Sequence, residues 1–290
     1  MNNWPNTHQG TSSNLLTSAP LTQNFTPNAS ANISSNSSHT FKSFPELPKS
    51  NQTISVTSGM RINDAIEKAS DYSTIIIESG KYLECIRVTK PLYFQANGKV
   101  SLRSDGINEC VIVSSPFVSF TGFSIKQKSS RIRGSVKIIS GAVILHNCVF
   151  KTLSMATIQV QNDSIVQMKN CKVYGSKSPA LQALNKSQIE AFDTAFSNST
   201  TTIINITNEA FARFSNCAFN ESRNGGVVSS ESSFLLVENS SFAHSMIEFR
   251  SDSSECFINN CTLGNDSLIK TNNNCSNISI TKNNLTNSTI

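Results

Sequence analysis

Apolar residues in the C-terminal half of the chain recur in a short cycle that restarts at one marker, Asn-Cys-x-apolar. The intact and degenerate copies of this marker begin at Asn147, Asn170, Asp193, Asn216, Asn239 and Asn260. Successive markers are 23 residues apart up to position 239, and the last step is 21 residues. A fixed period of this length with strand-like patterning is typical of a solenoid, in which each repeat forms one coil and the coils stack.

Three strands are predicted in each coil. Positions two and four residues before the marker are apolar, as Leu235 and Val237 are before Asn239. The third position after the marker is apolar again, in Phe150, Val173, Phe196, Phe219, Phe242 and Leu263. Alternation, a break and a fresh apolar residue predict a strand, a tight bend and a second strand. A third strand follows at pairs such as Ile158 and Val160. Residues 53–290 are therefore predicted to form an all-β, parallel β-helix with coils of about 22–23 residues.

The marker itself is interpreted as structural. Asparagine tolerates unusual backbone angles at a tight bend, and stacked amides can bond to each other as an asparagine ladder. The cysteines that follow the marker, Cys148, Cys171, Cys217 and Cys261, are expected to form a parallel column and to be free thiols. Since no Cys-x-x-Cys occurs, and His146 and His244 lie on different coils, no metal site is predicted.

The N-terminal region differs in composition. Residues 1–52 are dominated by Asn, Ser, Thr and Pro without a period, and they are predicted to be a disordered tail. Residues 41–48 are its most apolar part; they are interpreted as a linker that touches the domain, with a short docking motif as the alternative. From Met60 to Ala69, apolar residues recur at helical spacing, which predicts a short capping helix near 60–71.

The segment after the tail resembles a known family. An Asp64-Ala65-Ile66 helix, an Ile-rich strand at 75–77, Gly80-x-Tyr82-x-Glu84 and Lys90-Pro91-Leu92 are similar to the N-terminal cap and first turns of right-handed parallel β-helix proteins. These proteins form the pectin-lyase-like superfamily, and the resemblance covers roughly residues 58–290. The Asn/Ser/Thr-rich style is similar to non-enzymatic β-helix proteins of unicellular eukaryotes. The resemblance implies the fold but no single activity, because the superfamily contains both enzymes and binding scaffolds.

Candidate chemistry is sparse. Superfamily enzymes resemble one another in using paired acids, or an acidic calcium site with a basic residue, on an outward strand face. The outward positions of the third strand are expected at Gln159, Gln182, Asn205, Ser229, Glu248 and Lys270. Near the end of this amide-rich column, Glu231, Glu248 and Arg250 are the weak catalytic candidates, and surface ion pairing explains them better. No catalytic signature of the superfamily occurs, which favours a protein without enzymatic activity but leaves an enzyme open as an alternative; no cofactor is expected.

The preferred hypothesis is a non-catalytic scaffold that binds an unknown protein or glycan along this face. Gln159, Gln182, Asn205 and Lys270 are the predicted binding residues. The alternatives are a carbohydrate-active enzyme, a lyase or hydrolase with a divergent site, and a surface adhesin. The adhesin would be extracellular by unconventional export, and it would give meaning to the many Asn-x-Ser/Thr triplets.

Charge and targeting signals limit the expected partners and cellular location. Only 15% of residues are charged and the net charge is +5, without aromatics interleaved among the basic residues, so no nucleic acid is expected as a partner. Neither a secretory signal nor an apolar run long enough for a membrane span is visible, which predicts a cytoplasmic protein. The last coil has no visible cap, and a homodimer through that end is a possible assembly.

Overall fold

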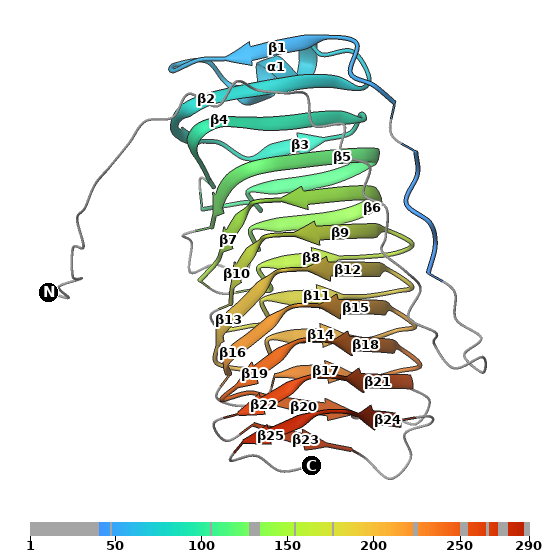
Figure 1. The fold of residues 1–290 in the computed structure, drawn as a ribbon. Coiled ribbons are helices and arrows are strands. Elements are labelled where there is room, and N and C mark those ends of the chain that lie inside the picture. Colours follow the sequence, from blue (N-terminus) through green and yellow to red (C-terminus); the bar gives the residue numbers. More distant parts are fainter. Residues whose placement is uncertain are drawn as a thin grey trace, which may run out of the picture. The chain divides into compact units, whose positions relative to one another are not determined.

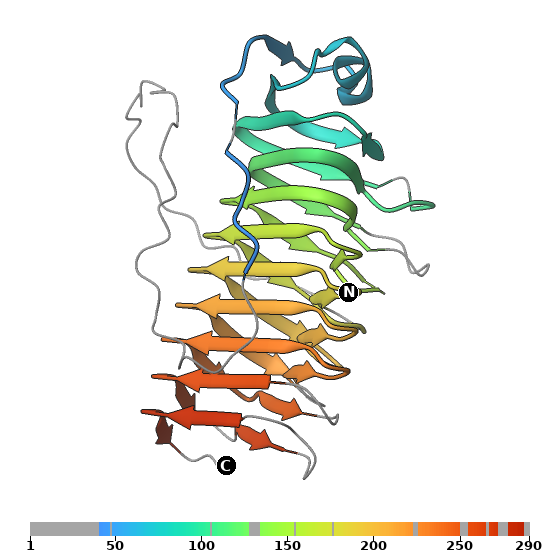
Figure 2. The same ribbon diagram turned by 90° about the vertical axis from the view of Figure 1, so that its right-hand side faces the viewer.

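The computed structural model describes residues 41–46, 48–104, 106–127, 134–153, 155–175, 177–222, 226–249, 255–264, 267–271 and 278–286. These residues hold one short helix, and 25 strands that pair in parallel and wind into coils (Figures 1 and 2). The predicted all-β solenoid with coils of about 23 residues is therefore confirmed.

The strands line three sides of the coil. The first side holds β1 (Thr53–Val56), β2 (Ser73–Leu83), β4 (Leu92–Arg103), β5 (Val111–Lys126), β6 (Val136–His146), β9 (Ile165–Lys169), β12 (Gln188–Phe192), β15 (Phe211–Ser215), β18 (Phe234–Glu238), β21 (Glu255–Asn259) and β24 (Ile278–Thr281). The second side holds β7 (Val149–Lys151), β10 (Lys172–Tyr174), β13 (Ala195–Ser199), β16 (Ala218–Ser222), β19 (Ser241–Ala243), β22 (Thr262–Gly264) and β25 (Asn284–Thr286). The third side holds β3 (Ile86–Val88), β8 (Ile158–Val160), β11 (Leu181–Ala183), β14 (Ile204–Ile206), β17 (Val227–Ser229), β20 (Met246–Phe249) and β23 (Leu268–Lys270). The long strands β2, β4, β5 and β6 bend through corners and contribute to more than one side.

Residues at equivalent positions of successive coils stack in columns inside the β-helix. On the second side, Phe196 pairs with Phe219 and Phe219 pairs with Phe242 in successive strands. The three rings are buried and stacked, with centroids 5.5 Å apart in the first pair and 4.6 Å apart in the second. Because side chains alternate along each strand, one file of aromatic rings fills the interior while its neighbours point outward.

The marker residues form the predicted column. Asn147, Asn170, Asn216 and their equivalents all have a φ between +50° and +54°, which lets the chain turn from the first side to the second. Each backbone N–H in this column donates to the next coil, as from Asn170 to Phe192 O at 3.2 Å. Side-chain bonds also join coils: Asn216 Nδ2 donates to Asp193 Oδ1 at 3.3 Å. Asp193 therefore takes part in the column as a hydrogen-bond acceptor.

The cysteines after the marker are buried free thiols. Each thiol donates to a backbone carbonyl of the preceding coil, as Cys217 Sγ does to Ala191 O at 3.4 Å. Burial raises the pKa of Cys171 to about 11 and that of Cys217 to about 12. Their role is consistent with packing, since the thiolate, the reactive form, is disfavoured.

Helix α1 (Ile62–Lys68) closes the N-terminal end of the core, as the pattern around residues 60–71 predicted. Its N-cap residue, Arg61, makes no side-chain capping bond. Instead, the carboxylate of Glu84 accepts from the N–H of Ile62 at 2.7 Å and from the N–H of Asn63 at 3.2 Å. A residue from the next coil thus caps the helix and ties it to the solenoid.

A segment ahead of β1 runs along the first side. Residues 1–40 and 47 of the predicted 1–52 tail lie outside the described residues. Residues 41–46 and 48–50, which form no strand, extend across the ends of successive first-side strands, where Figure 2 shows them in blue. Among the described residues, no helix has the length and apolar character needed to cross a bilayer.

Candidate binding surface

The third side presents a column of amide side chains. Pairing between β8, β11 and β14 places Gln159 beside Gln182 and Gln182 beside Asn205. All three side chains are half-buried and point out of the core, because the flanking residues of each strand are fully buried. Gln159 Nε2 donates to Gln182 Oε1 at 3.1 Å, so the amides are already aligned with the helix axis.

The column changes character after Asn205. Val228, and not Ser229, is the Cα partner of Asn205, and Glu248 is the partner of Val228. The expected outward position of Ser229 was therefore wrong: Val227 and Ser229 point into the core and Val228 points out. Because Val227 and Val228 are both apolar, the sequence pattern alone does not say which of them points into the core.

The acid–base candidates lie in different settings. Glu248 pairs with Lys270, the last predicted binding residue, with Oε1 3.6 Å from Nζ. Glu231 lies at a corner with a φ of +56° and accepts a hydrogen bond from Thr207 Oγ1 at 2.7 Å. Arg250 lies outside the described residues. Each of the two glutamates thus contacts a residue on the adjacent coil, as expected of cross-strand pairs in a stacked sheet.

A second polar line was missed by the sequence analysis. On the first side, Gln167, Glu190 and Arg213 are outward partners in successive strands. Arg213 Nη2 lies 3.2 Å from Glu238 Oε2, and both side chains are largely buried. Desolvation raises the pKa of Glu190, and the nearby charge of Arg213 opposes this effect. Position three before each marker carries these residues, so the 23-residue period could have revealed them.

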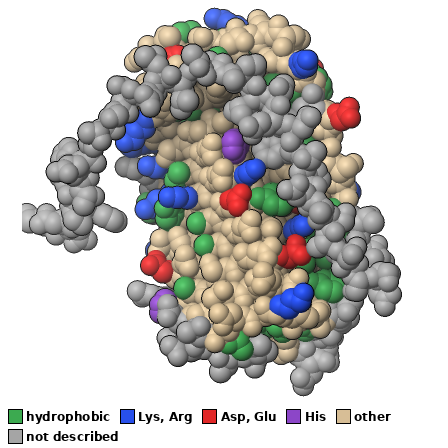
Figure 3. Space-filling view, in the orientation of Figure 1, with side chains coloured by type: hydrophobic (Ala, Val, Ile, Leu, Met, Phe, Trp, Pro, Cys, Tyr) green, Lys and Arg blue, Asp and Glu red, His purple; other side chains and the backbone are tan. Residues whose placement is uncertain are grey.

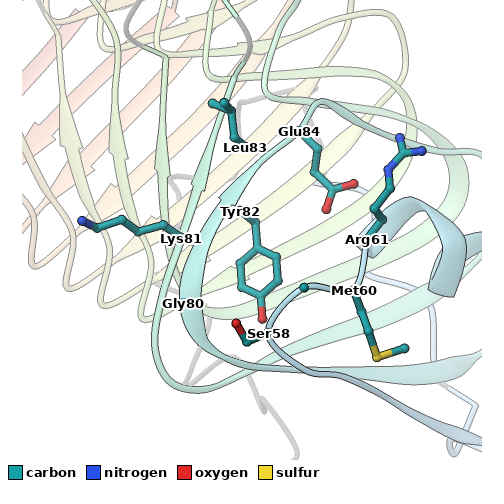
Figure 4. A pocket seen from close by; sticks show the side chains of 9 residues that line it. Ser58, Met60, Arg61, Gly80, Lys81, Tyr82, Leu83 and Glu84 are labelled. Atoms are coloured by element: carbon teal, nitrogen blue, oxygen red, sulfur yellow. The ribbon is translucent and has the colours of Figure 1, made fainter.

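The end cap holds a pocket of about 300 Å³. Met60, Arg61 and Glu84 belong to its lining, and Glu84 is the carboxylate that caps α1. In Figure 4, Glu84 points toward Arg61 and the start of the helix, whereas Lys81 points away from the pocket. The Glu84 carboxylate therefore has a structural role in capping helix α1.

Charge and metal-binding groups are thinly spread. The space-filling view in Figure 3 shows charged side chains of both signs, scattered over a mostly uncharged surface. Among the residues that the structure describes, no cluster of three or more His, Cys, Asp or Glu side chains is placed to hold a metal ion.

The strand pairing defines a parallel β-solenoid of the pectin-lyase-like fold. A family model described as "Right handed beta helix region" matches residues 106–245 and 156–290, which together span more than half of the chain. The chain therefore belongs to the right-handed β-helix family. No sequence among curated proteins matches it.

A solved structure shows the same fold at low sequence identity. Pectate lyase Pel9A superposes with a TM-score of 0.59 at 9% identity, covering 81% of this chain and 78% of the lyase. A pectin methylesterase from Aspergillus niger gives a TM-score of 0.47 at 13% identity, covering 80% of this chain and 88% of the esterase. At this level of identity, the likeness concerns the course of the backbone and not the reaction.

Proposed function

We propose that this chain is a non-catalytic β-helix scaffold that binds an extended, uncharged glycan along its third side. The supporting observation is the register of Gln159, Gln182 and Asn205, which repeats amide groups once per coil. Each amide offers both a donor and an acceptor, and a glycan hydroxyl group needs both. Stacked coils repeat at about 4.8 Å, so the column presents equivalent groups to successive units of an extended ligand.

A glycan fits this stretch better than a polypeptide does. Protein-binding surfaces depend on a few buried aromatic, aliphatic or arginine anchors. The outward residues from Gln159 to Asn205 supply amides instead, and they are half-buried without forming an apolar pocket. Lys270 pairs with Glu248 farther along the same side and would mark one end of the surface.

The test is binding of the full-length protein to neutral and acidic polysaccharides, measured by isothermal titration calorimetry. We expect a Q159A/Q182A/N205A variant to lose binding of the glycan that the unmodified protein retains. The matched control is S197A/N220A, which removes two outward polar side chains of paired strands on the second side. Equal binding by both variants, or binding of extended peptides alone, would contradict the proposal.

A divergent carbohydrate-active enzyme is the second candidate, and the cluster on the first side favours it. Glu190 combines a raised pKa with a neighbouring arginine, a combination found in many active sites. A β-strand ion-pair ladder produces the same features, so the enzyme needs direct evidence. Turnover of a polysaccharide that disappears in Glu190→Gln or Glu248→Gln, while binding persists, would favour the enzyme over the scaffold.

A further inference from the structure

The first side of the β-helix holds extended chain, and that chain is the protein's own residues 41–46 and 48–50. Its first anchor is Phe41, whose ring meets the edges of two rings on adjacent coils. The Phe41 centroid lies 6.4 Å from that of Phe211 and 5.9 Å from that of Phe234, at interplanar angles of 70° and 82°. Such edge-to-face contacts add specificity to apolar burial.

The second anchor is a two-point clamp on the peptide backbone. Lys42 N donates to Gln188 Oε1 at 2.7 Å, and Gln188 Nε2 donates to Lys42 O at 3.0 Å. Both hydrogen bonds involve backbone atoms of Lys42, so they do not depend on the side chain at this position. Gln188 is only 3% exposed, so its amide is held in place. Lys42 Nζ also lies 3.2 Å from Asp163 Oδ1, in an exposed ion pair that favours a basic residue at this position.

The third anchor is Phe44, three residues after Phe41. Its ring meets the edge of Phe117, with centroids 6.3 Å apart, and it packs on a small outward cluster separate from the main core. That cluster contains Phe117, Ala142, Ile144 and Tyr93. Farther along, the Tyr93 hydroxyl donates to Pro48 O, and Thr74 Oγ1 donates to Ser50 Oγ at 2.8 Å.

The docking surface is part of the β-helix, whereas the segment that covers it is held by few contacts. Phe117 and Phe234 belong to strands of the β-helix and are buried, whereas Ser43, Pro45 and Glu46 of the segment are exposed. The segment forms no strand, and its contacts beyond the two aromatic rings are a few side-chain bonds. A segment held in this way opens at far lower cost than the core does.

We propose that this surface, formed by Asp163, Gln188, Phe117, Phe211 and Phe234, is a docking site for an extended segment of a partner protein. The partner segment carries two phenylalanines three residues apart with a basic residue after the first, as in Phe-Lys-x-Phe. Residues 41–46 and 48–50 occupy the site in cis and compete with the partner. Because a tethered segment acts at an effective concentration of about millimolar, a partner of modest affinity is excluded until the segment is displaced.

The test uses the full-length protein and a fluorescent peptide with the sequence of residues 41–50. The unmodified protein is compared with F41A/F44A, which weakens the cis segment and leaves the surface unchanged. A third variant, F41A/F44A/Q188A, also removes the clamp. Circular dichroism and thermal melting confirm that each variant is folded, and a peptide with both phenylalanines replaced by alanine is the matched probe.

We expect the peptide to bind F41A/F44A at least about tenfold more tightly than the unmodified protein, since the cis competitor is weakened. Adding Q188A should weaken that binding by about tenfold or more, because two backbone hydrogen bonds are lost. Failure of the folded F41A/F44A variant to bind the peptide would overturn the proposal. Equal binding of the alanine peptide would overturn it as well. The third-side glycan surface is not involved, so either proposal can fail alone.

Discussion

Gln188 holds Lys42 at both of its backbone polar groups, although the two residues are 146 positions apart in the chain. The clamp joins a segment ahead of the first coil to the middle of the solenoid. It depends on a glutamine that is buried on an outward face, where a glutamine side chain would ordinarily be solvated.

Replacing Gln188 with alanine should release residues 41–50 and leave the coils intact. The variant loses two hydrogen bonds and leaves the Lys42 N–H and C=O without these partners, which costs about 1–3 kcal/mol. We expect tryptic cleavage after Lys42 and Lys49 to become several-fold faster, with native circular dichroism. Gln167→Ala, an outward glutamine on the same side that contacts Glu190, is the control and should leave the cleavage rate unchanged. Equal rates for the two variants would mean that the clamp contributes little.

Phe219→Ala should destabilise the β-helix by about 3–5 kcal/mol, because it opens a cavity in a stacked file of buried rings. Its ring contacts Phe196 and Phe242 above and below. Gln182→Ala, on the outward third side, should change the free energy of unfolding by less than about 1 kcal/mol. Urea denaturation of the two variants provides the comparison, and similar midpoints would show that the inward and outward assignments do not govern stability.

Asn216 should tolerate glycine better than alanine. Its φ of +54° lies in the left-handed region, which costs a residue with a Cβ about 1–2 kcal/mol unless its side chain compensates. Glycine adopts this conformation without that cost but loses the bond to Asp193. We expect thermal melting to rank the unmodified protein first, Asn216→Gly second and Asn216→Ala third. A ranking in which alanine exceeds glycine would indicate that the amide ladder, and not the backbone angle, determines the residue.

The buried thiols predict a loss of stability at alkaline pH. Desolvation raises the pKa of Cys217 from 9.0 to about 12, so the unfolded chain releases this proton at a lower pH than the folded chain does. Stability is therefore unaffected below about pH 8 and falls as the pH passes through the unfolded pKa toward the folded one. Each such thiol contributes a slope of up to about 1.4 kcal/mol per pH unit in that window.

Cys217→Ser isolates this effect, since Ser240 occupies the equivalent position one coil later and donates to the Glu238 carbonyl. Urea midpoints measured at pH 8, 9 and 10 should fall more steeply for the unmodified protein than for the variant. Parallel curves would show that the Cys217 thiol does not ionise on unfolding in this range.

The structure of one coil could be predicted because the repeat fixes both which residues face the core and which residues form the corner. The residue three after each marker must fill the interior, and the marker must adopt a positive φ; both requirements select residue types that can be recognised without coordinates. Phe219 and Asn216 could therefore be assigned to the core and the corner from the sequence. Where the local pattern was ambiguous, at Val227 and Val228, only the pairing with Asn205 decided the phase.

Contacts between distant parts of the chain could not be predicted in this way. The sequence by itself determined the winding, the inward files, the corner column and the amide groups of the third side, because each depends on spacing along the chain. Only the tertiary structure decided that Phe41 packs on Phe211 and Phe234, and that Gln188 binds the backbone of Lys42. The physical reason is that these contacts depend on which outward surfaces are covered, and no periodic pattern encodes what covers them.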